Sequence, residues 1–170
     1  MPDATGLELL AQELGELVPG SILGTEFGAG SRAVLLADPA QVKRVLAHLK
    51  DRGYTFLASL HGVDYLPEEP RLGVLYELLD MTEVDRVSVK VRVPIDAARV
   101  ESVVELWPGA DFQERETYDM FGVEFDGHPD LRRILMPEDY EGHPQRRDFP
   151  VGGEPVLFTY NEIQSYGKDM

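Results

Sequence analysis

The sequence predicts an α+β fold, in which an antiparallel sheet has helices packed on one face and is followed by a long irregular arm rich in proline and arginine. Apolar residues recur at helical spacing near the start of the chain, and three later segments alternate apolar and polar residues as strands do. Residues 114–150 then contain four prolines, and every basic residue among them apart from histidine is arginine. A length of 170 residues suits one domain with a real core.

The first helix is expected at residues 5–17, where leucines recur every three or four positions before Pro19-Gly20 ends the pattern. Two short strands, at residues 21–23 and 32–37, are expected around the turn-forming Gly28-Ala29-Gly30.

A second helix is expected to begin at Asp38 and to end at Gly53. Asp38 is predicted to cap it, Pro39 suits its first turn, and Gln41 completes a pairing that resembles a capping box. Its apolar stripe consists of Val42, Val45, Leu46 and Leu49.

Three strands follow, at residues 54–60, 72–78 and 87–93. The last strand alternates valine with charged or polar residues, so we expect one buried face and one cationic face in water. The short linkers between these strands favour hairpins.

Two further helices are predicted. The first is expected to be capped by Asp96 and to place Val100, Val103 and Trp107 on one face before Pro108. The second is expected at residues 112–121, with Gly122 as its C-terminal stop. Three parts then result: an α+β core at residues 1–121, a signature arm at residues 122–150 and a tail at residues 151–170, which either folds back or lies on a neighbour.

The chain is strongly acidic, with a formal net charge of −15. Nucleic acid and anionic membranes are therefore poor partners, and a basic protein partner is favoured. The sequence contains no cysteine, which rules out disulfides and argues against an iron–sulfur cluster held by this chain. Its N-terminus lacks the pattern of a secretory signal, and its apolar runs fall short of the ~20 residues that span a bilayer. We expect a cytoplasmic protein that reaches membranes only through others.

A glycine-rich segment at residues 28–33 fits a relaxed dinucleotide fingerprint. A true fingerprint opens a helix that receives the pyrophosphate, whereas here a strand and then Pro39 follow. A plain turn is the favoured interpretation, and we do not expect NADH to bind this chain.

Three carboxylates, Glu114, Glu116 and Asp119, lie close together on the helix expected at residues 112–121. They could perform acid–base chemistry, hold a metal or pair with nearby arginines. Pairing is the favoured alternative, because it needs no further group and because charges that enter an interface must find partners.

Two histidines, His128 and His143, stand in the repeated tripeptide Gly-His-Pro. They could be metal ligands or proton carriers. The flanking glycine and proline instead favour two built turns in which the imidazoles donate or accept hydrogen bonds.

The segment from residue 114 to residue 150 closely resembles the signature of the 30 kDa subunit family, the C subunit, of proton-translocating NADH-quinone oxidoreductase, which is bacterial respiratory complex I. The matching blocks are Glu114 to Gly122, Gly127 to Leu135 and Gly142 to Pro150. Two departures are Gln145, where leucine is usual, and Arg147, where lysine is common.

The resemblance implies a non-catalytic structural subunit in the hydrophilic arm of the complex, on the cytoplasmic side of the membrane. It implies no cofactor in this chain and docking on the D subunit, which resembles the large subunit of nickel–iron hydrogenases, among the other subunits of the hydrophilic arm. The residues expected at that interface are Glu114, Arg115, Tyr118, Asp119, Phe121, Gly122, His128, Pro129, Arg132, Arg133, His143, Arg146, Arg147, Asp148 and Phe149.

Two alternatives stay open on the sequence alone. One is the equivalent subunit of a related membrane-bound hydrogenase, or of a dehydrogenase that uses ferredoxin or a deazaflavin. The other is a free-standing acid–base or metal enzyme built on Glu114, Glu116, Asp119 and His128.

Overall fold

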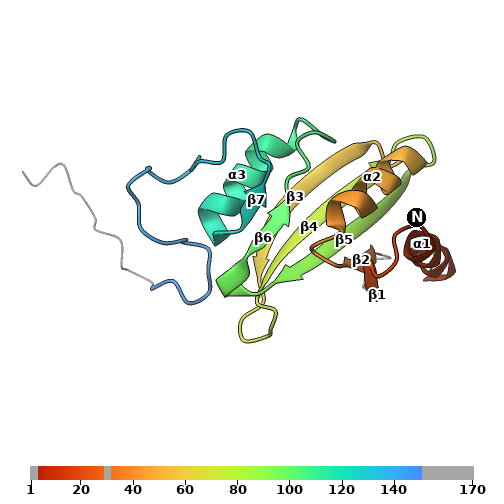
Figure 1. Ribbon diagram of the computed structural model, residues 1–170, viewed down its shortest axis with the longest axis horizontal. Coiled ribbons are helices and arrows are strands. Elements are labelled where there is room, and N and C mark those ends of the chain that lie inside the picture. The colour runs from red at the N-terminus through yellow and green to blue at the C-terminus, as the bar shows by residue number, and fades with distance from the viewer. Residues whose placement is uncertain (1–3, 29–31, 151–170) are drawn as a thin grey trace, which may run out of the picture.

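A five-stranded sheet lies at the centre of the computed structural model, which describes residues 4–28 and 32–150 (Figure 1). The strand order is β1-β2-β5-β4-β3. The strands are β1 (Ile22–Gly28), β2 (Arg32–Ala37), β3 (Phe56–Asp64), β4 (Leu72–Asp80) and β5 (Asp85–Val93). The predicted α+β fold is therefore confirmed, with a strand in each of the five regions where one was predicted.

One pair of strands departs from the antiparallel prediction. The β1–β2, β3–β4 and β4–β5 pairs are antiparallel, whereas β2 and β5 are parallel. The antiparallel pairs join strands that follow one another in sequence and could be predicted, but β2 and β5 meet only after the chain has passed through a helix and two strands.

Three α-helices accompany the sheet: α1 (Ala4–Leu17), α2 (Val42–Arg52) and α3 (Ala110–Phe121). The prediction that Asp38 caps α2 was wrong. Its carboxylate accepts the N–H of Ala40 at 2.7 Å and so stabilises the turn before the helix, which begins at Val42. Gly53 does end α2 as predicted, with φ at 127°.

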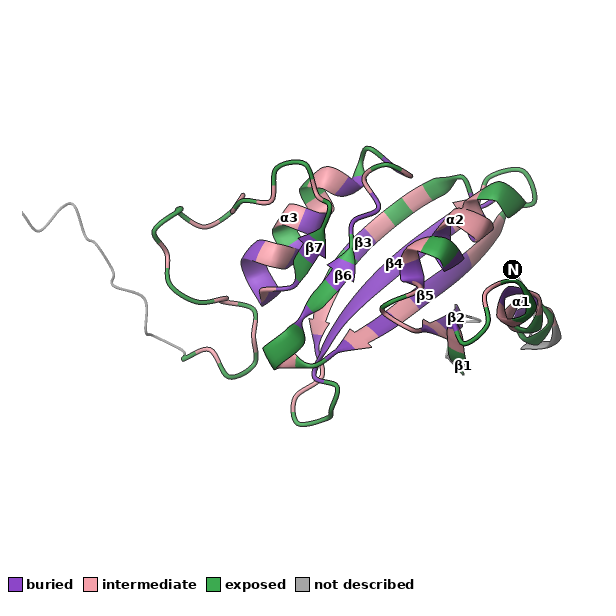
Figure 2. Cartoon of the chain, viewed as in Figure 1, coloured by how far each residue is buried: buried purple, intermediate pink, exposed green. Residues whose placement is uncertain are grey.

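The helices pack on the sheet face that carries the valines of β5. On this face Val91 pairs with Val74, and Val74 pairs with Gly62. The ring of Phe121, the last residue of α3, lies directly against Gly62 and leaves no room for a Cβ there. Figure 2 shows the buried centre of β4 and β5 beneath α2. The sheet thus positions α3 through a glycine contact.

The opposite face of β5 is more buried than predicted. Ser88 is fully buried and its hydroxyl donates to Glu77 at 2.7 Å. The side chain of Lys90 is only 13 % exposed and pairs with Glu26 at 2.7 Å. Arg92 stacks on the ring of Tyr65 at 4.4 Å from its centre. The cations are present, but neighbouring side chains cover them.

The helix predicted before Pro108 does not form. Residues 95–101 instead make a short 3-10 helix, η1 (Ile95–Ala97), and the strand β6 (Arg99–Glu101), which pairs in parallel with β7 (Glu124–Asp126). The N–H of Val103 donates to the carboxylate of Glu114 at 2.7 Å, and Trp107 donates through its indole to Thr55 O at 2.9 Å. Glu114 therefore takes a backbone N–H that a helix would use, and only one helical turn forms, in which the N–H of Trp107 donates to Val103 O.

The second predicted helix is confirmed as α3, and Gly122 ends it in the left-handed conformation at φ 74°. Two predictions, the turn at residues 29–31 and the tail at residues 151–170, lie outside the described residues. Across residues 4–28 and 32–150, none of the helices has the length and apolarity needed to cross a membrane.

Candidate functional site

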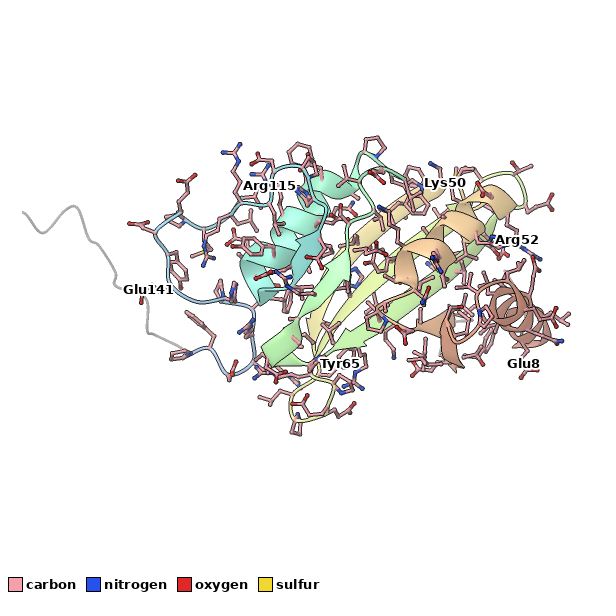
Figure 3. The ribbon with its side chains drawn as sticks, in the orientation of Figure 1. Glu8, Lys50, Arg52, Tyr65, Arg115 and Glu141 are labelled. Carbon is pink, nitrogen blue, oxygen red and sulfur yellow. The ribbon has the colours of Figure 1, made fainter. Side chains whose placement is uncertain are left out.

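The signature arm, residues 122–150, follows helix α3 from one end to the other. Strand β7 carries the chain to His128 near the amino end of α3. The chain then returns along the helix, where the Arg115 side chain donates to the carbonyls of Arg132 and Arg133 at 3.2 and 3.3 Å. It reaches the carboxyl end of α3 at His143. Figure 3 labels Arg115 on α3 and Glu141 on the arm. The signature arm, which the sequence analysis predicted to dock on a partner, therefore binds along a helix of its own domain.

At the amino end of α3, the His128 side chain is completely buried. Its Nδ1 accepts the N–H of Asp130 at 3.0 Å, which leaves Nε2 to donate to the carbonyl oxygen of Asp111 at 3.3 Å. This arrangement supports the predicted built turn, because both ring nitrogens have structural partners.

Beside His128, Glu114 is also completely buried. Its two carboxylate oxygens accept the N–H of Val103 and the hydroxyl of Ser102, both at 2.7 Å. Burial raises the pKa of Glu114, although these two donors and His128 oppose that rise. The prediction that Glu114 pairs with an arginine was wrong, since its partners are a hydroxyl and a backbone amide, with His128 4.0 Å away.

Midway along the return path, the carboxylate of Asp119 holds the arm. One oxygen accepts the N–H groups of Ile134, Leu135 and Met136 at 2.8–3.0 Å, and the other pairs with Arg133 at 2.6 Å. Burial alone would raise the pKa of Asp119, but these donors outweigh it and lower the pKa. The predicted acid–arginine pairing is confirmed for this carboxylate.

Arg133 also holds the far part of the arm, because its second terminal nitrogen donates to the carbonyls of Tyr140 and Gly142 at 2.8 and 2.9 Å. One guanidinium therefore links three stretches of chain. A lysine could not make this set of contacts, since it lacks the planar fork.

At the carboxyl end of α3, the arm supplies the caps that the helix needs. The last four carbonyls receive the N–H of Gly122, a ring nitrogen of His143, the N–H of Gln145 and Nε of Arg146, at 2.7–3.2 Å. Carbonyls at a helix end have no partner within the helix. Burial also lowers the pKa of His143. The second Gly-His-Pro motif is therefore a helix cap contributed from 24 residues away.

The arm is also held by Arg71 and Asp64, two residues that the sequence analysis missed. Arg71 is buried and pairs with Asp64 at 2.9 and 2.7 Å and with Asp148 of the arm at 2.7 and 2.5 Å. Asp64 also accepts the N–H of Arg147 at 2.8 Å. Hydrogen bonds from Arg71 lower the pKa of both Asp64 and Asp148. Only the isolated position of an arginine at the start of a strand could have drawn attention to Arg71.

The other predicted interface residues take smaller roles. Tyr118 is half-buried, with its ring centre 6.3 Å from that of His143, and Phe149 stacks on Tyr140 at 6.2 Å. Arg132 pairs with Asp130 in solvent at 2.8 Å, and Arg147 donates to Leu66 O at 2.5 Å. Pro129 is exposed.

Two large apolar side chains remain in solvent beside this framework. Phe112 on α3 is 63 % exposed, and Leu135 on the arm is 59 % exposed. The guanidinium of Arg115 lies 6.0 Å from the centre of the Phe112 ring. We call Phe112, Arg115 and Leu135 the outer patch. The sequence analysis named Arg115 but missed both apolar members.

Glu114, Asp119 and the two histidines all have structural partners, whereas Glu116 is exposed on the surface of α3. Over residues 4–28 and 32–150, there is no group of three or more histidine or carboxylate side chains that could hold a metal ion. Glu114 and Asp119 lie fully buried under the arm, where a substrate has no access to them.

An α+β domain with a long arm bound along its own third helix is the class of protein that this fold and site define. A family model described as the 30 kDa subunit of the respiratory-chain NADH dehydrogenase matches residues 35–155. The chain belongs to this family.

Named relatives agree with the family match. The chain is 45 % identical to the C subunit of NADH-quinone oxidoreductase from Roseiflexus sp. (strain RS-1), over 98 % of its length and 94 % of the relative. It is 47 % identical to NADH-quinone oxidoreductase subunit 5 of Thermus thermophilus, covering 68 % of this chain and 60 % of the relative.

Two solved structures share the fold. The trypsin-resistant fragment (1–134) of Nqo5 matches with a TM-score of 0.65 and 34 % identity, over 74 % of this chain and 98 % of that chain. A chain of an archaeal membrane-bound sulfane sulfur reductase matches with a TM-score of 0.72 over 95 % of both chains. At 23 % identity, the second likeness shows the fold alone.

Proposed function

We propose that this chain is a non-catalytic structural subunit in the peripheral arm of NADH-quinone oxidoreductase. It supports electron transfer from NADH through iron–sulfur centres to quinone, coupled to proton translocation, by holding a partner in fixed geometry. The partner is the D subunit, which resembles the hydrogenase large subunit, and the chain lies with the other hydrophilic-arm subunits on the cytoplasmic side of the membrane. The chain itself binds no cofactor.

The observation that carries this proposal is the outer patch on a fixed framework. Asp119, Arg133 and Arg71 anchor the signature arm, so Leu135 is held near the carboxyl end of α3 through its own N–H, while Phe112 lies in the first turn of the helix near Arg115. Exposed apolar side chains on a fixed framework are available for apolar contact with a partner. A preformed surface also avoids the cost of ordering a loop on binding.

The alternative of a free-standing enzyme has less support. Its four expected groups were Glu114, Glu116, Asp119 and His128, and three of these are buried beneath the arm with structural partners. Acid–base catalysis requires a group within reach of its substrate. The other alternative, a subunit of a related hydrogenase or dehydrogenase, also has less support, because the relatives named above are subunits of NADH-quinone oxidoreductase.

The test is purification of the tagged chain from its own gently solubilised membranes, with identification of the proteins that accompany it and an assay of NADH-quinone activity. We expect a hydrogenase-like large subunit together with active flavin and iron–sulfur partners. A nickel-containing partner would favour the related hydrogenase instead. A monomer that carries a metal would contradict the proposal.

A matched pair of variants tests the surface. Phe112→Glu combined with Leu135→Glu is expected to reduce recovery of the partner about tenfold or more, because a charge replaces apolar contact at the patch. Leu9→Glu is the control, since Leu9 on α1 is 63 % exposed, as Phe112 is. Equal recovery from both variants would show that the outer patch is not the docking surface.

A further inference from the structure

Two arginines of the signature arm, Arg132 and Arg146, have terminal nitrogens that are not engaged within the described part of the chain. Arg132 is exposed, whereas Arg146 is half-buried. Arg133 uses both of its terminal nitrogens, and so does Arg71. Arg146 makes one hydrogen bond, from Nε to the carbonyl of Phe121 at 2.7 Å. The edge of its guanidinium that carries the two terminal nitrogens therefore has no acceptor among residues 4–28 and 32–150.

The Arg146 guanidinium is nevertheless held in place. Its Nε bond fixes it to the last carbonyl of α3, and it packs beside His143 over Gly122. A Cβ on Gly122 would overlap both side chains, so the glycine leaves the space that the guanidinium occupies. A surface arginine with free rotamers would not be confined in this way.

The nearby carboxylates are already committed to other cations. Asp148 and Asp64 both pair with Arg71, and Asp119 pairs with Arg133. Moving Asp119 to Arg146 would leave the largely buried Arg133 without its carboxylate, and moving Asp64 or Asp148 would remove one of the two carboxylates that Arg71 holds. Burial lowers the pKa of Arg146, and the charges of Asp148 and Asp64 oppose this effect.

A half-buried guanidinium with an open edge is suited to one class of ligand. A carboxylate can accept two parallel N–H bonds from a guanidinium, in a geometry that a lysine cannot reproduce. The chain carries a formal net charge of −15, so an acidic partner segment would be repelled by most of its surface and attracted at this point.

We propose, resting on the proposed function, that Arg146 binds an aspartate or glutamate side chain of the partner subunit at the carboxyl end of α3. Tyr118 and His143, whose rings meet edge to face, line the same end of the helix and set the approach. The contact fixes the orientation of the partner, whereas Phe112 of the outer patch supplies apolar contact near the other end of α3.

The experiment places an amine at this position with Arg146→Lys in the tagged full chain. The complex is purified from its own membranes and treated with a water-soluble carbodiimide. This reagent activates a carboxylate, which the neighbouring amine attacks to form an amide, and the activator leaves as a urea. We expect a cross-linked peptide that joins position 146 to an aspartate or glutamate of the partner. Arg44→Lys is the control, because Arg44 is an exposed arginine of α2 whose hydrogen bond is to Gln41.

Each outcome decides a different question. An intact complex in which position 146 forms no cross-link to the partner would overturn this inference and leave the proposed function standing. Failure of the wild-type chain to bring down a partner would overturn the proposed function itself. If Arg146→Lys prevents assembly while the free chain has the melting temperature of wild type, the inference holds and the planar guanidinium is required for the contact. If assembly is lost together with a lowered melting temperature, Arg146 is a structural cap and the inference fails.

Discussion

His128 and His143 lie at opposite ends of α3, although both occupy the central position of a Gly-His-Pro tripeptide. His128 donates to Asp111 in the first turn, whereas His143 contacts the carbonyl of Asp119 in the last turn. The repeated motif therefore marks the two places where the signature arm meets the ends of the same helix.

Asp119→Asn tests the central anchor of the arm. The change removes a buried charge that pairs with Arg133 and accepts three backbone N–H groups, so we expect the free energy of unfolding to fall by about 3 kcal/mol. Urea unfolding of the purified chain measures it. Asp130→Asn is the control, because its pair with Arg132 is about 60 % exposed on both sides and is expected to contribute less than about 1 kcal/mol. Equal losses in the two variants would contradict the anchoring role.

Gly122→Ala tests whether space, and not only backbone conformation, is required at the end of α3. Gly122 and Gly127 both have positive φ, at 74° and 84°, and alanine is expected to cost about 1–2 kcal/mol at either position for that reason. At Gly122 the new methyl group also collides with His143 and Arg146, whereas nothing lies within 4 Å at Gly127. We therefore expect a clearly larger loss of stability for Gly122→Ala in thermal unfolding. Matching losses would argue against the close contact.

Gly62→Ala tests the contact that seats α3 on the sheet. The added methyl group meets the ring of Phe121, and overfilling a packed site of this kind costs about 1–3 kcal/mol. Gly15→Ala is the opposite control, since Gly15 lies within α1 with nothing within 4 Å, and alanine there is expected to stabilise the chain by about 0.5–1 kcal/mol. Chemical denaturation of the two variants should therefore give shifts of opposite sign.

The Arg71 cluster predicts how stability depends on pH. Arg71 lowers the pKa of Asp64 and Asp148 in the folded chain. The stability from these groups is therefore complete above the pKa of an unfolded aspartate, about 3.9, and is lost as the pH falls below it toward the folded values. We expect wild type to be more stable than Arg71→Met at pH 7, with the difference shrinking below about pH 4. Arg99→Met, at an exposed pair with Glu124, should show little change over the same range. A difference that stays constant down to about pH 2.5 would contradict the linkage.

The sequence correctly predicted the helices and strands that depend on residues close together in the chain. Alternating valines placed β5, a leucine stripe placed α1, and Gly122 ended α3 where a left-handed residue was needed. It failed where distant groups compete for the same donors. Residues 99–107 have a helical pattern of apolar side chains, but the pairing of β6 with β7 and the carboxylate of Glu114 take N–H groups of residues 99–103, so only a single turn forms after Val103.

The candidate site shows the same division. The arginine, acid and histidine residues of the signature were recognisable, yet their partners were not, because nothing local connects Arg71 with Asp148, 77 residues away. The composition of the arm suggested attachment to another protein. The structure adds that most of this chemistry first attaches the arm to its own domain, which single-sequence patterns cannot separate from attachment to a partner.

The capping of α3 by the arm has a consequence for how the protein is made. Chains emerge from the ribosome amino end first, and the groups that complete the last turn of α3 belong to residues 143–146. During synthesis, the final carbonyls of α3 and the carboxylate of Asp119 therefore lack these hydrogen-bond donors until the arm has been synthesised. A nascent chain interrupted before His143 would contain every strand of the sheet but would leave the carboxyl end of α3 without its caps.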